Sequence, residues 1–235
     1  MKNLFKYFLF FLSFYSHLCL AGGGGISSLT GATLPEQMIQ EATAVNQLTE
    51  ATTQTAQQLQ LITNQVKNLT TLPQQIWPSV SEQLTQLINL MGSAQGLNYS
   101  RLNTIDNAST VYGLPSQPLQ QYSQKSQQWT NNLLSQVTTL LNQYGLESSQ
   151  FVNEQQSLAT LQNLNTNAVG RMQVLQAGNQ ISGLLVNQLQ LLRQDIMSGN
   201  QVMMNAYTNQ ANQFQQDRNN GETWINSNNQ YMSSY

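Results

Sequence analysis

The 235-residue sequence contains a single cysteine, Cys19, and a single histidine, His17. From residue 22 onward the chain therefore carries neither a thiol nor an imidazole. This absence excludes disulfide frameworks, cysteine- and histidine-based zinc sites, catalytic cysteines and any serine nucleophile that depends on histidine. The same part of the sequence has no phosphate-binding glycine loop, dinucleotide-binding fingerprint or zinc-protease motif. We therefore expect no catalytic site, no cofactor and no metal.

Charged residues are also scarce, at 8% of the chain, where about a quarter is usual. Glutamine, asparagine, serine and threonine take their place. Beyond residue 21 six basic residues stand against ten acidic ones, which gives a formal charge of −4. Nucleic-acid binding needs clustered lysine and arginine, so we expect no nucleic-acid partner. The six cations are scattered along the chain: Lys67, Arg101, Lys125, Arg171, Arg193 and Arg218.

Residues 1–21 have the order of a secretory signal peptide. Two lysines precede an apolar stretch from Tyr7 to Leu20, which is shorter than the roughly 20 residues that cross a bilayer. We expect cleavage after Ala21, which leaves no stable membrane anchor. Lipidation of Cys19 is the alternative, and Leu18 disfavours it because lipoprotein signals carry a small residue there. A flexible, glycine-rich segment, 22–32, follows.

A long helix is predicted over residues 33–70. Thr33 and Glu36 have the spacing of a capping box, and Pro35 suits a first helical turn. Apolar residues and two threonines then recur at alternating spacings of 3 and 4, which is the heptad pattern of a helix that packs against other helices. The positions are Val45, Leu48, Thr52, Thr55, Leu59, Ile62, Val66 and Leu69.

Residues 71–118 are predicted to form a small irregular or helical appendage. Pro73 and Pro78 interrupt the preceding helical pattern, and turn-forming glycines recur up to residue 113. Trp77, Tyr99 and Tyr112 are candidates for an exposed tip surface, because aromatic side chains are enriched at interface centres. The competing interpretation, which we favour, is that they form the core of the appendage.

Helical periodicity returns over residues 119–218. A second helix runs from Leu119 to Tyr144, with Gly145 as its left-handed cap, and a third begins near Ser148 or Ser149. Glycines inside this third helix are costly unless another backbone approaches closely; they are Gly170, Gly178, Gly183 and Gly199.

A loosely ordered tail, 219–235, is predicted to close the chain. The sequence thus predicts an all-α fold, an elongated bundle of about three long helices with an appendage between the first and the second. The nearest approaches to an acid/base pair are Asp217 with Glu222 and Glu147 with Glu154. Solvated surface charge is the better interpretation of both.

Two stretches resemble the TrbJ family of conjugative transfer proteins, which is related to the minor pilins of type IV secretion systems. One is Asn64-Gln65-Val66-Lys67-Asn68-Leu69. The other extends from Val169 through the Gln-Ala-Gly-Asn-Gln core to Gln180 and continues into Leu189–Arg193. The resemblance implies a helical bundle exported to the periplasm or the pilus surface. It also implies contact with other secretion subunits, assembly with copies of itself, and contact with the recipient cell.

The second stretch is a candidate assembly contact, because two glycines eight residues apart lie near the same helix face. Packing within the monomer is the alternative, and we favour it. The residues concerned are Gly170, Arg171, Gln176, Ala177, Gly178, Asn179 and Gln180.

The function predicted from the sequence is a non-enzymatic minor pilus and adhesion subunit that supports pilus assembly and mating-cell contact. The alternative is a periplasmic helical holdase chaperone or a free secreted coiled-coil protein. Holdases present a charged or apolar clamp, whereas neutral amides dominate here, so the first prediction is preferred.

Overall fold

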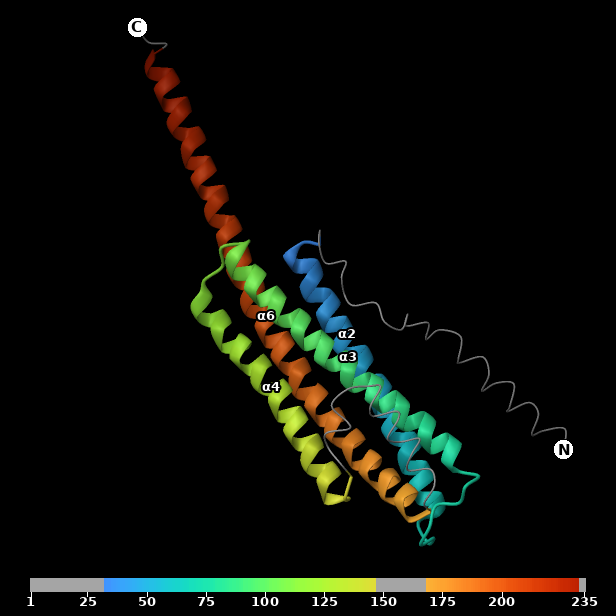
Figure 1. The fold of residues 1–235 in the computed structure, drawn as a ribbon. Coiled ribbons are helices and arrows are strands. Elements are labelled where there is room, and N and C mark those ends of the chain that lie inside the picture. Colours follow the sequence, from blue (N-terminus) through green and yellow to red (C-terminus); the bar gives the residue numbers. More distant parts are fainter. Residues whose placement is uncertain (1–31, 147–167, 233–235) are drawn as a thin grey trace, which may run out of the picture. The chain divides into compact units, whose positions relative to one another are not determined.

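The computed structural model describes residues 32–146 and 168–232. These residues form helices and no strand: α2 (Leu34–Val66), α3 (Trp77–Thr110), α4 (Ser116–Gln143) and α6 (Ala168–Met232). Helix α6 packs against the other three, and α3 also packs against α2 and α4 (Figure 1). The all-α bundle predicted from the sequence is confirmed. The predicted signal peptide, residues 1–21, and residues 22–31 of the predicted glycine-rich segment lie outside the described residues.

The start of α2 is fixed by Glu36. Its carboxylate accepts hydrogen bonds from the backbone amide of Thr33, at 2.7 Å, and from the Thr33 hydroxyl, at 2.9 Å. These bonds, the backbone one first, lower the pKa of Glu36. The capping box predicted from Thr33 and Glu36 is therefore present at the start of α2.

The heptad seam of α2 faces the bundle interior. Even its two threonines, Thr52 and Thr55, are buried, and the Thr55 hydroxyl donates to the carbonyl of Ala51 at 3.0 Å. Such a bond satisfies a buried hydroxyl inside its own helix. The helix ends at Val66, and Leu69 is exposed.

The segment predicted to be an appendage is instead a full bundle helix. Helix α3 has 34 residues, and Pro78 lies in its first turn, where a missing amide costs nothing. Gly92 and Gly96 face solvent and do not break it. Apolar contacts outweigh the helix-propensity cost of about 1 kcal/mol for each glycine. The buried residues of α3 that make these contacts include Val80, Leu84, Leu87, Ala94, Leu97, Ile105 and Ala108.

Helix α4 agrees with the prediction for a second helix. It starts three residues before Leu119 and ends before Gly145, whose φ of +69° gives the left-handed cap expected from the sequence. The amide of Leu146 then donates to the carbonyl of Leu141 at 2.9 Å.

Helix α6 is 65 residues long, or about 98 Å at 1.5 Å per residue. The predicted start of this helix near Ser148 lies outside the described residues. The prediction of a loosely ordered tail is wrong as far as Met232, because α6 continues through Asn219, Asn220 and Gly221. Extending an existing helix avoids the cost of nucleating a new one, which explains why these weak helix formers do not end it.

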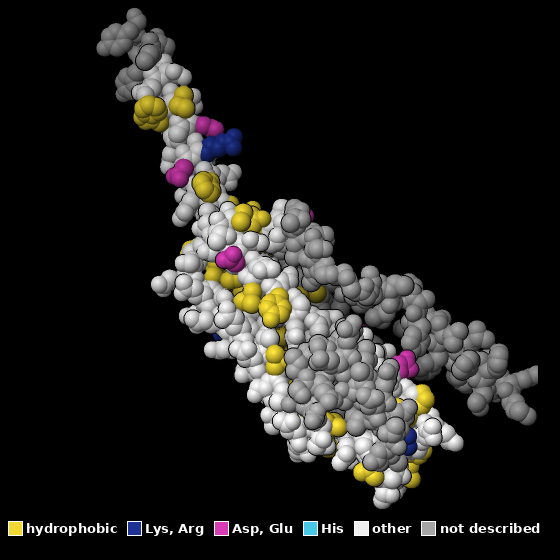
Figure 2. Space-filling view, in the orientation of Figure 1, with side chains coloured by type: hydrophobic (Ala, Val, Ile, Leu, Met, Phe, Trp, Pro, Cys, Tyr) yellow, Lys and Arg dark blue, Asp and Glu magenta, His cyan; other side chains and the backbone are white. Residues whose placement is uncertain are grey.

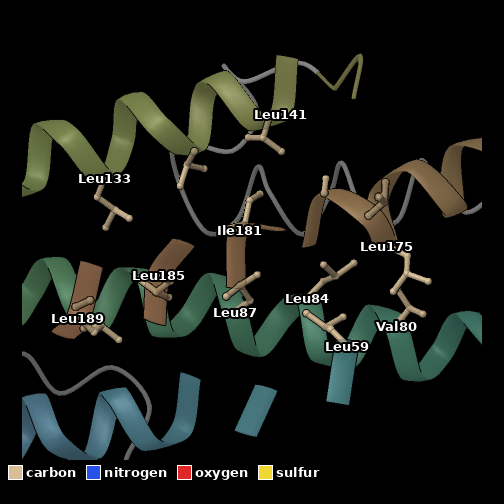
Figure 3. Close-up of a cluster of buried hydrophobic side chains, with 14 of the residues drawn as sticks. Leu59, Val80, Leu84, Leu87, Leu133, Leu141, Leu175, Ile181, Leu185 and Leu189 are labelled. Atoms are coloured by element: carbon tan, nitrogen blue, oxygen red, sulfur yellow. The ribbon is translucent and has the colours of Figure 1, made fainter. Parts of the chain in front are cut away.

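The larger hydrophobic core draws leucines, isoleucines and valines from all four helices. Figure 3 shows Leu59 and Leu84 beside residues of α6, and Leu133 and Leu141 extending from α4. Each fully buried leucine contributes about 1.5 to 3 kcal/mol. A smaller cluster lies near the start of α2 and consists of Leu34, Met38, Ile105, Ala108, Leu114, Leu119 and Met203.

Candidate functional site

The stretch 170–180, the candidate assembly contact, is divided between the two sides of α6. Gly170, Arg171, Ala177 and Gly178 are buried, whereas Gln176 and Gln180 are exposed and Asn179 is half-buried. A Cβ atom on Gly178 would overlap Cδ2 of Leu84 and lie 3.8 Å from Cδ1 of Leu59. The geometry at Gly178 therefore supports internal packing, in which α6 meets α3 and α2.

Arg171 links α6 to the connection between α2 and α3. Its Nη2 donates to the carbonyl oxygen of Leu72 at 3.3 Å, and both residues are buried. A charged donor that satisfies a buried carbonyl fixes the position of a loop.

The three aromatic candidates do not share one surface. Trp77 is 5% exposed and belongs to the larger core, whereas Tyr99 is 60% exposed. Tyr112 packs against the smaller cluster, with its ring centroid 6.1 Å from that of Tyr207 at an interplanar angle of 77°. Because Trp77 and Tyr112 lie at opposite ends of α3, the aromatics form neither a single tip nor a single core.

The structure adds a buried polar layer that sequence reasoning missed. Nη1 of Arg101 donates to Oε2 of Glu41 at 3.0 Å and to Oδ1 of Asn200 at 2.6 Å. The hydroxyl of Thr104 donates to the other carboxylate oxygen of Glu41. Nδ2 of Asn200 donates to the carbonyl of Met38 at 2.9 Å. We call Glu41, Arg101, Thr104 and Asn200 the polar layer; it joins α2, α3 and α6.

This layer separates the two hydrophobic clusters. Arg101 stands between Leu97 of the larger core and Ile105 of the smaller one, and Glu41 stands between Val45 and Met38 in the same way. The sequence contains a signal for the polar layer. Glu41 and Arg101 lie on the 3–4 spacing of their helices, at positions otherwise filled by apolar side chains.

Glycine at position 199 makes room for the guanidinium group. A Cβ atom there would overlap Nη2 of Arg101 and lie 3.2 Å from Cδ1 of Tyr122. The predicted close approach at this glycine is therefore observed, although the approaching group is a side chain. At Gly183 no atom lies within 4 Å of the added Cβ, so the tight crossing predicted there is absent.

Burial dominates the electrostatics of the layer. It raises the pKa of Glu41, and the charge of Arg101 and the hydrogen bonds from Thr104 and Arg101 oppose the rise. Burial likewise raises the pKa of Asp195, whose carboxylate lies 3.7 Å from Nζ of Lys125. The same ammonium lies 5.0 Å from the ring centroid of Tyr122. Lys125 and Tyr122 therefore bring α4 next to the part of α6 that contains the polar layer.

A second polar contact fixes α4 against α3. Nδ2 of Asn98 donates at 2.7 Å both to the carbonyl of Ser126 and to the hydroxyl of Thr130, and the Ser126 hydroxyl donates to Oδ1 of Asn98. One helical turn further along α4, Nε1 of Trp129 donates to the carbonyl of Gln188 at 2.7 Å.

The layer is built to position helices and is closed to substrates. The side chains of Arg101 and Glu41 are 0% and 3% exposed, so a solute cannot reach them without opening the bundle. Buried ion pairs of this kind can fix the register of packed helices.

Asp217 and Glu222, one of the two carboxylate pairs singled out from the sequence, do not form an acid/base site. Glu222 lies on the exposed face of α6, 3.6 Å from Arg218 in an ordinary i,i+4 pair, and Asp217 is exposed beside it. Glu147 and Glu154 lie outside the described residues. No group of three acidic, histidine or cysteine side chains within residues 32–146 and 168–232 could hold a metal ion.

The sequence is similar to curated conjugal transfer proteins. It is 30% identical over 206 residues to the conjugal transfer protein TrbJ of Rhizobium radiobacter, a match that covers 84% of this chain and 74% of that protein. It is 26% identical over 180 residues to the probable conjugal transfer protein TrbJ of Sinorhizobium fredii, covering 73% of this chain and 65% of that protein. No protein-family model matches the chain. No solved structure matches it significantly.

Proposed function

Because the chain belongs to the TrbJ family of conjugal transfer proteins, we propose that it is a non-enzymatic subunit of a conjugative type IV secretion system. In this role it contributes to pilus assembly and mating-cell contact by packing its helices against other subunits. The observation that carries the proposal is the sequence similarity to two TrbJ proteins, which extends over most of the chain.

The chemistry of the described residues supports a contact role. The ionisable groups held closest together, Glu41 and Arg101, are sealed inside the bundle. On the face drawn in Figure 2, the described residues are mostly neutral, with scattered hydrophobic side chains and few charges. Such a surface offers hydrogen bonds and apolar contacts to another protein, which are the components of ordinary protein interfaces.

The proposal includes export across the inner membrane, to the periplasm or the pilus surface. Its support is the signal-peptide pattern of Met1–Ala21 in the sequence. Of the helices described, none has an apolar stretch long enough to cross a bilayer. Mass spectrometry of the protein recovered from the periplasmic fraction tests this part, and a first residue of Gly22 is the expected result.

Mating efficiency tests the function directly. A donor strain lacking the gene is complemented with the wild-type gene, with a version without residues 1–21, or with Gly183→Ala as a control that touches no neighbouring atom. Transfer should be lost in the deletion strain and restored by the wild type and by Gly183→Ala, but not by the leaderless version. Immunoblots must show equal amounts of each protein.

Undiminished transfer in the deletion strain would reject the proposal and favour a holdase or a free secreted coiled-coil protein. Restoration by the leaderless version would retain a role in conjugation and reject export.

A further inference from the structure

The last part of α6 has no covering helix among the described residues. From Ala211 to Asn229 every residue is exposed, including Phe214 at 67% and Ile225 at 53%. Figure 1 shows this end of α6 continuing past the ends of α3 and α4. We call the segment Ala211–Asn229 the overhang; it is about 28 Å long at 1.5 Å per residue. Its exposed apolar side chains gain no free energy from burial unless a partner covers them.

The overhang carries a seam that continues the face that α6 buries in the bundle. Met203 is fully buried and lies four residues before Tyr207, which is itself partly buried against the smaller cluster. From Tyr207 onward the spacing alternates strictly between 4 and 3, which keeps the positions on one side of a helix. The seam positions are Tyr207, Ala211, Phe214, Arg218, Gly221, Ile225 and Asn228.

We propose that the overhang pairs with the same segment of a second copy of this chain, in antiparallel orientation. In this register Phe214 of one copy packs against Ile225 of the other, and the long Arg218 packs against Gly221. Ala211 then faces Asn228. Each large seam residue thus meets either an apolar partner or a glycine that leaves room for it.

Charge selects the antiparallel orientation. In a parallel pair in register, Arg218 would face its own copy, and Asp217 would flank Glu222 of the partner, so that like charges meet at both places. In the antiparallel register Asp217 flanks Trp224 and Glu222 flanks Gln215, with no like-charge contact. With only three charged residues in the overhang, two copies also repel each other little.

Sedimentation equilibrium of the full-length protein, purified as the host processes it, tests the pairing. We expect a monomer–dimer equilibrium that Phe214→Asp or Ile225→Asp weakens by at least about tenfold. Thr223→Asp adds the same charge on the opposite face of the helix and should leave the dissociation constant unchanged. All three positions are exposed, so thermal unfolding of the bundle should be the same in every variant when it is measured at a concentration low enough to keep each protein monomeric.

Disulfide trapping tests the orientation. With Cys19→Ser the chain has no cysteine of its own, so Phe214→Cys and Ile225→Cys each introduce a single thiol. Mild oxidation of the two variants mixed together should give a cross-linked dimer that neither gives alone. Cross-linking of each variant with itself would establish a parallel pair and overturn the proposal. A chain that stays monomeric and uncross-linked at every concentration would overturn it as well.

Pairing through the overhang requires only α6 and is independent of the proposed function. A monomeric protein that still supports mating would reject the pairing and leave the conjugation role intact. A protein that is dimeric but dispensable for mating would confirm the pairing and reject the conjugation role.

Discussion

The guanidinium of Arg101 lies 3.0 Å from the carboxylate of Glu41, and neither side chain reaches solvent. Removing one partner leaves the other charge buried and unpaired. Arg101→Met should therefore lower the free energy of unfolding by about 3 to 5 kcal/mol. In a double-mutant cycle, Glu41→Gln combined with Arg101→Met should cost less than the sum of the single changes, by about 0.5 to 3 kcal/mol.

Urea denaturation followed by circular dichroism measures all four proteins of this cycle. Arg193→Gln is the control, because Arg193 is exposed on α6, and it should have no measurable effect. Additive single effects would show that Glu41 and Arg101 do not stabilise the bundle as a pair.

The titration of Glu41 predicts a pH dependence. Burial raises its pKa above the ordinary value of 4.5, so between the two values the folded protein holds a proton that the unfolded chain has lost. The contribution of Glu41 to stability is complete below pH 4.5 and is lost as the pH rises through the raised value. Glu41→Gln cannot titrate, so the stability of wild type relative to this variant should fall across that window.

Unfolding free energies of both proteins at a series of pH values test this. Asp195 and Glu36 titrate in both proteins, so their contributions cancel in the difference. A difference that stays constant or grows with pH contradicts the direction assigned to Glu41.

Glycines 178 and 183 should respond oppositely to alanine. The methyl group of Gly178→Ala overlaps the buried side chain of Leu84, so we expect a loss of about 1 to 3 kcal/mol from overpacking. Gly183 is exposed with open space around its Cβ position. There alanine should stabilise the helix by about 1 kcal/mol through helix propensity alone.

Differential scanning calorimetry of the two single variants gives the comparison. Equal effects of the same sign would mean that α6 and α3 do not approach closely at Gly178.

The indole of Trp129 predicts a smaller effect. Its Nε1 donates to the carbonyl of Gln188 at 2.7 Å inside the bundle. Trp129→Phe removes this bond and some buried volume, and should cost about 1 to 3 kcal/mol in chemical denaturation. Trp224→Phe is the matched control, since Trp224 is 67% exposed, and it should leave the midpoint unchanged.

Periodicity predicted α2 and α4 well because their seams are regular and their ends carry clear signals. Glu36 marks the first turn of α2, and Gly145 marks the end of α4. The same reasoning failed for α3, because Gly92, Gly96 and Pro78 predict interruptions of a helix, whereas α3 is continuous through all three. Tertiary contacts override such local signals, and those contacts are not visible in a single sequence.

The polar layer was missed for a related reason. In the sequence, Glu41 and Arg101 each look like a polar interruption of an apolar seam. Only the fold shows that these two residues, 60 positions apart in the chain, form a pair between α2 and α3. The glycines at 178 and 199 were predicted to allow close approach, and the structure supplies the approaching groups, Leu84 and Arg101.

The scarcity of surface charge has a consequence for the medium in which the protein works. Dissolved ions act on proteins mainly by screening exposed charges, over a Debye length of about 8 Å at physiological ionic strength. With 8% charged residues, and with the Arg101–Glu41 pair shielded from solvent, little remains for salt to screen. The stability of the bundle should therefore change little as the ionic strength varies from about 0.01 to 0.15 M.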